Sequence, residues 1–384
     1  MSVTAAKGFT ASGVAAGIKE NGHPDLALVV NNGPRLAAAG VFTSNRVKAA
    51  PVLWSEQVLK GGQVSAVVLN SGGANACTGP GGFQDTHATA EKVADVLGHS
   101  AGEVAVASTG LIGLRLPMDA VLPGVEAAAA ALSPHGGEKA AIAIKTTDTV
   151  HKTAVAQSPD GWTLGGMAKG AGMLAPGLAT MLVVLTTDAE VDAPELDAAL
   201  RAATRTTFDR IDSDGCMSTN DTVLLLASGA SGVAPAHADF AEAVRTVCAD
   251  LARQLIGDAE GASKDIRIEV VGAATEDDAV EVGRSIARNN LLKCAIHGED
   301  PNWGRVLSAI GTTSAAFDPD QLNVAINDVW VCKNGSVGED RELVDMRYRE
   351  VRITADLSAG SESAVIWAND LTADYVHENS AYSS

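Results

Sequence analysis

Residues 165–185 read GGMAKGAGMLAPGLATMLVVL, and the composition of the chain changes most sharply within this stretch. The glycine-rich residues 165–172 predict a flexible loop, and the apolar run 181–185 predicts a buried strand. Thr180 stands at the junction of the two. A threonine at the start of a strand is usually only a β-favouring residue, so by itself this position predicts structure rather than chemistry.

On the N-terminal side, short apolar runs between glycine and asparagine turns predict three strands. A helix is expected between the second and third, and residues 134–137 should form a loop. The expected strands are Leu26–Val30, Ala66–Asn70 and Val104–Ala107, and the expected helix is Asp85–Leu97.

On the C-terminal side, apolar residues at helical spacing predict two helices, within 196–208 and 240–255. Alternating apolar residues predict further strands in a C-terminal third that is rich in antiparallel pairs. These strands should lie at 266–270, 322–326 and 351–355, with a helix opening at Thr275 and a hairpin turn at Asn334-Gly335. We therefore expect an α/β protein with layered sheets flanked by helices, and no linker divides it.

The composition excludes several classes of function. A net charge of −19 is poor for neutralising phosphates, so nucleic acid is not an expected partner. Five scattered cysteines without a CxxC pair, and eight histidines without an HxxxH spacing, predict neither a disulfide framework nor a metal site. The start of the chain does not have the pattern of a secretory signal, and proline and glycine interrupt the apolar run 170–187. We expect a cytoplasmic protein that does not span a membrane.

The segment from Lys169 to Leu182 resembles the self-cleavage segment of the ornithine acetyltransferases (glutamate N-acetyltransferases), in which the threonine of Ala-Thr-Met-Leu becomes the nucleophile. Other stretches typical of that family occur in the expected order along almost the whole chain. They are NSGGANACTG (70–79), STGLIG (108–113), TTDT (146–149), STNDT (218–222), DAEGASK (258–264), HGEDPNWGR (297–305) and ENSAYSS (378–384).

The resemblance implies cleavage between Ala179 and Thr180 into an alpha chain of 1–179 and a beta chain of 180–384, and a heterotetramer of two copies of each. It implies the ornithine acetyltransferase-type fold and no cofactor. The implied reaction of arginine biosynthesis carries acetyl from N2-acetyl-L-ornithine to L-glutamate through Thr180. Some members of the family also use acetyl-CoA as donor, and none of the residues quoted above decides that point for this chain.

The chemistry of threonine fits this role. Inside the chain its nitrogen is an amide, whereas the α-amino group released by cleavage has a reference pKa of about 7.7–8.0 and can act as a base toward the adjacent hydroxyl. Thr109 and Gly110 follow the strand expected at 104–107, and they match the oxyanion-hole pair of the family.

For substrate binding, the resemblance assigns six residues to an amino-acid ligand. Lys169 can pair with a carboxylate and Glu260 with the δ-amino group of ornithine. Thr147 is a rival to Thr146, and the role of Asp300–Arg305 stays open. The assigned residues are Thr146, Lys169, Thr180, Glu260, Asn379 and Ser384.

The alternatives to acetyl transfer are a dinucleotide-dependent enzyme, a self-cleaving hydrolase and a non-catalytic binding protein. The sequence does not predict a dinucleotide-binding enzyme, because the glycine motif of such enzymes opens a helix. Here Gly170-Ala171-Gly172 instead continues through Pro176 into an expected strand. A self-cleaving amidase or aminopeptidase would share the nucleophile and differ only in passing the acyl group to water. An uncleaved relative that only binds an acetylated amino acid is the non-catalytic alternative.

Overall fold

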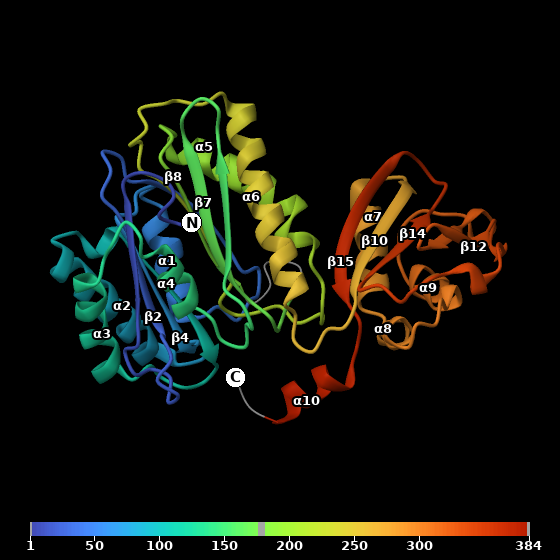
Figure 1. Cartoon of the computed structure of the whole chain (residues 1–384), viewed down its shortest axis with the longest axis horizontal. Helices are drawn as coiled ribbons and strands as arrows, with labels where there is room; N and C mark the ends of the chain where they lie inside the picture. Colours follow the sequence, from blue (N-terminus) through green and yellow to red (C-terminus); the bar gives the residue numbers. More distant parts are fainter. Residues whose placement is uncertain (1, 176–180, 382–384) are drawn as a thin grey trace.

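The computed structural model describes residues 2–175 and 181–381. The first layer is a four-stranded sheet of order β1-β2-β4-β5. Helices α2 and α3 pack on its outer face, and α1 lies beside β5 (Figure 1). The elements are β1 Phe9–Val14, β2 Leu26–Asn31, β4 Ala66–Gly73, β5 Val104–Leu111, α1 Ala50–Leu59, α2 Gly79–Leu97 and α3 Met118–Ala130.

The second layer is a five-stranded sheet of order β3-β9-β8-β7-β6. An apolar core, to which the short helix α4 contributes, joins its inner face to the first sheet, and α5 and α6 cover its outer face. All six residues of the central strand β8 are buried. The elements are β3 Ala37–Phe42, β6 Lys152–Gln157, β7 Thr163–Lys169, β8 Leu182–Thr187, β9 Thr222–Ala227, α4 Gly137–Ala143, α5 Ala193–Thr206 and α6 His237–Gly257.

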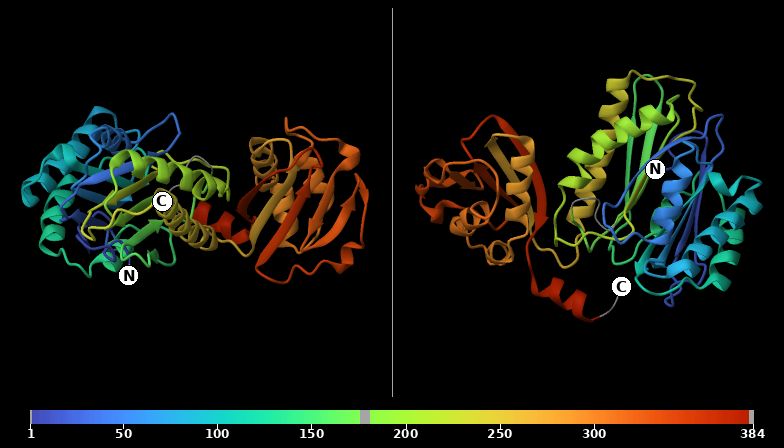
Figure 2. Two further views of the ribbon diagram at one scale, coloured as in Figure 1. Left: turned by 90° about the horizontal axis from the view of Figure 1, so that it is seen from above. Right: turned by 180° about the vertical axis from the view of Figure 1, so that it is seen from behind.

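A six-stranded sheet of order β13-β12-β11-β14-β10-β15 forms a separate C-terminal lobe with its own apolar core. After β15 the chain turns back, and α10 runs below the junction of the lobes in Figure 1 and in the right-hand view of Figure 2. The elements are β10 Asp265–Ala273, β11 Asn323–Ile326, β12 Val329–Lys333, β13 Ser336–Val337, β14 Glu350–Asp356, β15 Glu362–Asn369, α7 Glu276–Ala287, α8 Asn290–His297, α9 Trp303–Ile310 and α10 Ala373–Ala381.

This arrangement confirms the predicted α/β class, with layered sheets flanked by helices. The strands expected from apolar runs and from alternation are present, and Asn334-Gly335 makes the turn between β12 and β13. The Thr275 side chain caps α7 by accepting a hydrogen bond from the Asp278 N–H at 3.0 Å. Strand pairs in the C-terminal lobe are antiparallel except for β10 and β14, which are parallel.

The loop predicted at residues 165–172 is wrong over its first five residues, because residues 165–169 belong to strand β7. The glycines serve close packing there. A Cβ at Gly165 would lie 2.2 Å from the Ser2 carbonyl oxygen, and one at Gly166 would lie 2.7 Å from a Leu185 methyl carbon. Glycine is therefore needed in this strand for the approach of neighbouring segments.

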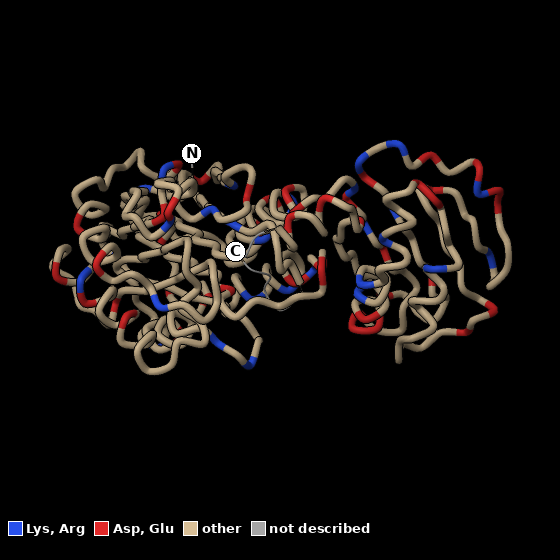
Figure 3. The backbone as a smooth tube through the Cα atoms, turned by 90° about the horizontal axis from the view of Figure 1, so that it is seen from below, with Lys and Arg blue, Asp and Glu red and all other residues tan. Residues whose placement is uncertain are grey.

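Charged residues of both signs are distributed over the described part of the chain, and Figure 3 shows basic residues scattered among acidic ones in both lobes. This arrangement does not concentrate positive charge as binding to a phosphate backbone would require. No helix within the described residues is long and apolar enough to cross a membrane.

The expected cleavage between Ala179 and Thr180 would divide the five-stranded sheet between two fragments. Strands β3, β6 and β7 precede that bond and β8 and β9 follow it, while β8 pairs with β7 on one side and β9 pairs with β3 on its outer side. We expect fragments 1–179 and 180–384 to elute together in gel filtration without denaturant and to separate in urea. Elution of free 1–179 fragment from native protein would contradict this interwoven arrangement.

Candidate functional site

Lys169 and Thr109 meet between the two stacked sheets. Lys169 ends β7 and is only 2% exposed, and its Nζ donates a hydrogen bond to the Thr109 Oγ at 3.2 Å. Because an ammonium group can only donate, the Thr109 oxygen must accept. Its hydroxyl hydrogen is then directed away from Lys169 and is free to donate to another group.

Thr109 and Gly110 lie within β5, which continues to Leu111. The strand expected at 104–107 is therefore longer than predicted and includes both residues, and its pairing with β4 becomes irregular only at Gly72 and Gly73. Gly110 has φ +131°, and a Cβ there would lie 2.5 Å from the Gly73 nitrogen. Only glycine fits this close approach of two strands, which fixes the direction of the backbone beside Thr109.

Glu260 follows helix α6 and is in contact with two segments distant in the sequence. Its N–H donates to the Ala171 carbonyl at 3.1 Å, and its Oε2 accepts from the Asn379 Nδ2 at 3.0 Å. A Cβ on Gly172 would lie 2.6 Å from each Glu260 carboxylate oxygen, so glycine leaves the space that the carboxylate occupies. The structure thus brings Glu260 and Asn379 together, as the predicted ligand site requires.

Two cavities adjoin Glu260. One of about 550 Å³ is also lined by Thr147 and Glu378. A smaller one of about 190 Å³ is also lined by Asp214, Lys293 and Tyr375. Thr147 thus faces a cavity that Glu260 shares, whereas the backbone of its rival Thr146 is held by Asp148, whose Oδ2 accepts the Thr146 N–H at 3.1 Å.

Asp148 belongs to a buried network of charges that the sequence reasoning did not assign. Its Oδ1 accepts from the Lys152 Nζ at 2.7 Å and from the Gly170 N–H at 2.6 Å. Lys152 also pairs with Asp258 at 2.5 Å, and neither the Lys152 nor the Asp148 side chain is exposed to solvent. The only signal for Asp148 in the sequence was its place inside the Thr-Thr-Asp-Thr stretch.

The network also sets the charge states around Lys169. Burial raises the pKa of Asp148, but the charges of Lys169 and Lys152 and the hydrogen bonds from Lys152 and Gly170 outweigh it and lower the pKa to about 2. Burial lowers the pKa of Lys169, and the charge of Asp148 opposes that shift. Asp148 therefore stays ionised near neutral pH and favours the ammonium form of Lys169.

Ala179, Thr180 and Ser384 lie outside the described residues, so the structure reports on their neighbours alone. The Met181 N–H donates to the Asp221 Oδ1 at 3.2 Å, and the Met181 carbonyl accepts from the Thr222 N–H at 3.1 Å. Asp221 is fully buried, which raises the pKa of its carboxyl group well above the usual range. Both backbone hydrogen-bonding groups of Met181, the first described residue after the expected cleavage point, are therefore bonded to Asp221 and Thr222, which end the Ser-Thr-Asn-Asp-Thr stretch.

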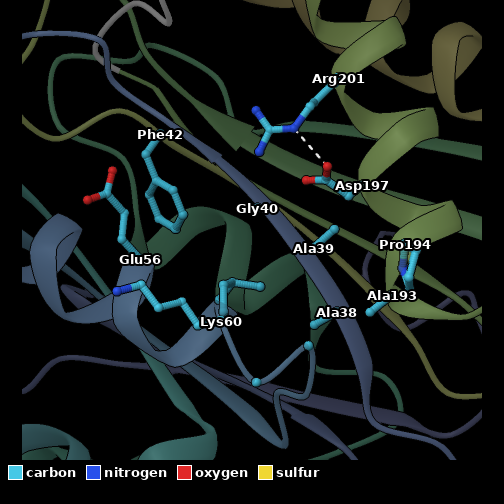
Figure 4. A pocket seen from close by; sticks show the side chains of 13 residues that line it. Ala38, Ala39, Gly40, Phe42, Glu56, Lys60, Ala193, Pro194, Asp197 and Arg201 are labelled. Carbon is cyan, nitrogen blue, oxygen red and sulfur yellow. Dashed lines mark hydrogen bonds and ion pairs between the residues drawn. The ribbon is translucent and has the colours of Figure 1, made fainter.

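A separate groove of about 520 Å³ lies between α1, the edge strand β3 and α5 (Figure 4). Its walls carry Glu56 and Lys60 on one side and the Asp197–Arg201 ion pair on the other. None of the candidate residues that the structure describes lines it. Within residues 2–175 and 181–381 there is also no group of three or more histidine, cysteine or acidic side chains placed to hold a metal ion.

The sequence of this chain is similar to those of known proteins along its whole length. The model of the ArgJ family matches residues 10–384. Proteins described as arginine biosynthesis bifunctional protein ArgJ are 85% identical in Streptomyces avermitilis and 64% identical in Thermobifida fusca, each over 384 residues that cover both chains completely.

A solved structure of ornithine acetyltransferase from Mycobacterium tuberculosis, complexed with ornithine, is 60% identical, with a TM-score of 0.46 over 47% of this chain and 96% of that one. The family match and the full-length relatives define this protein as an acyltransferase of arginine biosynthesis. The chain belongs to the ArgJ family. The predicted resemblance is thereby confirmed.

The buried network makes a specific prediction for stability. Lys152→Met would leave Asp148 and Asp258 as neighbouring buried carboxylates without their shared ammonium, and breaking a buried pair in this way costs roughly 3–5 kcal/mol. Arg201→Met removes a largely exposed ion pair with Asp197 and should cost at most about 1 kcal/mol. Urea unfolding of both variants measures the difference, and equal midpoints would contradict the assigned role of Lys152.

Proposed function

We propose that this protein transfers the acetyl group of N2-acetyl-L-ornithine to L-glutamate through an acetyl ester on Thr180. Membership of the ArgJ family and the ornithine named for the Mycobacterium tuberculosis relative support the choice of substrates. The observation that carries the proposal is the contact of the Lys169 ammonium with the Thr109 hydroxyl. Lys169 pairs with Leu182, two positions after Thr180 in the sequence, in the ladder between β7 and β8.

The nucleophile arises by self-cleavage in this proposal. The Thr180 hydroxyl attacks the Ala179 carbonyl carbon, the C–N bond breaks, and an ester joins the two residues. Water then opens the ester, which leaves a carboxylate on Ala179 and a free α-amino group on Thr180. That amino group takes the proton of the hydroxyl when Thr180 attacks the acetyl carbonyl, and it returns the proton to the leaving amine of ornithine.

Thr109 and Gly110 stabilise the oxyanion of the tetrahedral intermediate. The Thr109 hydroxyl has its hydrogen free, because its oxygen accepts from Lys169. The Gly110 N–H is the second donor in this proposal, and the close approach of Gly110 to Gly73 restricts the backbone that carries it. Removal of one such donor typically costs roughly 100-fold to 1,000-fold in rate, so this pair is a large part of the proposed catalysis.

The amino-acid ligand is bound by charged groups at its two ends. Lys169 pairs with the α-carboxylate that both substrates share, and Glu260, oriented by Asn379, pairs with the δ-ammonium group of ornithine. Thr146, the backbone of Thr180 and Ser384 supply the remaining polar contacts. Because ornithine leaves before glutamate enters, a single site serves both substrates.

The assembly that goes with this proposal contains two alpha chains of 1–179 and two beta chains of 180–384 and works in the cytoplasm. Use of acetyl-CoA as a second acetyl donor to glutamate is a distinct activity. It is assayed separately, with acetyl-CoA in place of N2-acetyl-L-ornithine.

Self-cleavage predicts that active protein contains two fragments and that the second begins with Thr180. Thr180→Ala removes the hydroxyl that attacks Ala179, so this variant should remain one chain and show no transfer. Intact-mass analysis under denaturing conditions checks both proteins. An active preparation that contains only the full-length chain would exclude the mechanism.

An acetyl-threonine intermediate predicts ping-pong kinetics, because ornithine is released before glutamate binds. Double-reciprocal plots with N2-acetyl-L-ornithine and glutamate varied together should give parallel lines. Intersecting lines would contradict the covalent intermediate. Release of acetate without formation of N-acetylglutamate would instead favour a hydrolase that passes the acetyl group to water.

A further inference from the structure

We infer that Asp148 is the positioning residue of the substrate site, a buried carboxylate that holds Thr146, the Lys169 end of β7 and the Glu260 turn in one arrangement. The inference rests on the proposed function, since that proposal makes these three segments bind the ligand. It assigns no contact between Asp148 and the substrate.

The first part of the argument is geometric. Both oxygens of Asp148 are used, Oδ2 by the Thr146 N–H at 3.1 Å and Oδ1 by the Gly170 N–H at 2.6 Å. Gly170 directly follows Lys169, so one carboxylate fixes the backbone at two proposed ligand residues that are 23 positions apart in the sequence, from 146 to 169. Movement of Asp148 would therefore displace both.

Lys152 extends this arrangement to the third segment. Its Nζ bridges the Asp148 Oδ1 at 2.7 Å and the Asp258 Oδ2 at 2.5 Å. Asp258 in turn accepts hydrogen bonds from both the backbone and the hydroxyl of Thr149 and lies two residues before Glu260. The loop 146–149 and the end of α6 are thus joined by charge-assisted hydrogen bonds, which are stronger and shorter than neutral ones.

The second part of the argument is electrostatic. Burial disfavours the Lys169 ammonium, and the nearby charges act in opposite directions. Lys152 and Lys19 also disfavour it, whereas the acidic groups favour it, with Asp148 the strongest of them. The groups that act on Lys169 are Asp148, Lys152, Glu260, Asp221 and Lys19. Loss of the Asp148 charge would therefore lower the pKa of Lys169 and deplete the ammonium form that pairs with a carboxylate.

Asparagine cannot replace Asp148 in this role, although it has nearly the same size. All three partners of Asp148 are donors, so the amide NH₂ of asparagine would face either the Thr146 N–H or the Gly170 and Lys152 donors. Asp148→Asn therefore removes the charge and disturbs the hydrogen bonds at the same time. Asp148→Glu keeps the charge and displaces the carboxylate.

Asp188 is the matched control, because it holds the opposite end of the same strand. It is 1% exposed and accepts hydrogen bonds from the Thr163 N–H at 2.7 Å and the Lys7 N–H at 3.0 Å. Asp188→Asn creates the same conflict of donors at the start of β7, far along the strand from Lys169. A general loss of packing in the sheet would affect both variants alike.

The test is isothermal titration calorimetry of ornithine with the processed proteins, from neutral to alkaline pH. Ornithine gains and loses protons in the same way in every titration, so a difference in affinity between two variants at one pH arises from the protein. Asp148→Asn should weaken binding by roughly tenfold or more and should lose the remaining affinity at a lower pH than Asp188→Asn does. If Asp148→Asn does not fold, Asp148→Glu is measured in its place. This variant should bind ornithine more weakly, but it should lose its affinity at the same alkaline pH as the unaltered protein.

Two outcomes would overturn the inference. In the first, Asp148→Asn binds ornithine as Asp188→Asn does at every pH, which would give Asp148 only a structural role. Where the asparagine variant does not fold, the same comparison is made with Asp148→Glu. That result leaves the proposed function intact, because acetyl transfer by the unaltered enzyme is measured independently. Absence of both ornithine binding and transfer in the unaltered enzyme would overturn the proposed function and the inference together.

Discussion

The Asp148–Lys152–Asp258 network is the interaction on which the arrangement of the candidate site depends. Its ammonium and its two carboxylates are almost completely removed from water, and a buried charge is tolerated only when it is paired and hydrogen-bonded. These pairs form only when residues 146–152 pack against the end of α6, because Lys152 must reach both Asp148 and Asp258. The packing of these two segments and the formation of the candidate site therefore depend on each other. A buried ion pair of this kind adds little net stability over apolar packing, whereas the loss of one partner is strongly destabilising.

A second constraint is the central position of β8 in the five-stranded sheet, because the expected cleavage point directly precedes this strand. Four of the five strands, β3, β9, β8 and β7, each have one neighbour from the other side of residue 179, so the sheet is complete only when both parts of the chain contribute. Because β8 pairs with β7 on one side and with β9 on the other, a break before β8 would leave both of these ladders in place. The same geometry holds Met181 between Asp221 and Thr222.

The lysine–threonine contact connects the two stacked sheets. Lys169 at the end of β7 and Thr109 in β5 come from different layers, and their side chains meet where the apolar core between the sheets gives way to polar groups. A buried ammonium beside a hydroxyl is costly unless acidic groups offset it, and Asp148 is the strongest of the acidic groups that do so, ahead of Glu260 and Asp221. The polar site is therefore stabilised by residues that the proposed reaction does not use directly.

The sequence by itself determined the α/β class, the central strands and the family. Apolar runs and alternation depend on neighbours along the chain, and the motif stretches are read without knowledge of the fold. Only the tertiary structure decided that Gly165 and Gly166 are strand residues, since Ser2 and Leu185 set the space available to them. It also decided that Lys169 is buried against Thr109, that Asn379 reaches Glu260, and that Asp148 connects the segments between them. These contacts join residues 22 to 119 positions apart, and no local pattern in a single sequence encodes which distant side chain completes a buried hydrogen bond.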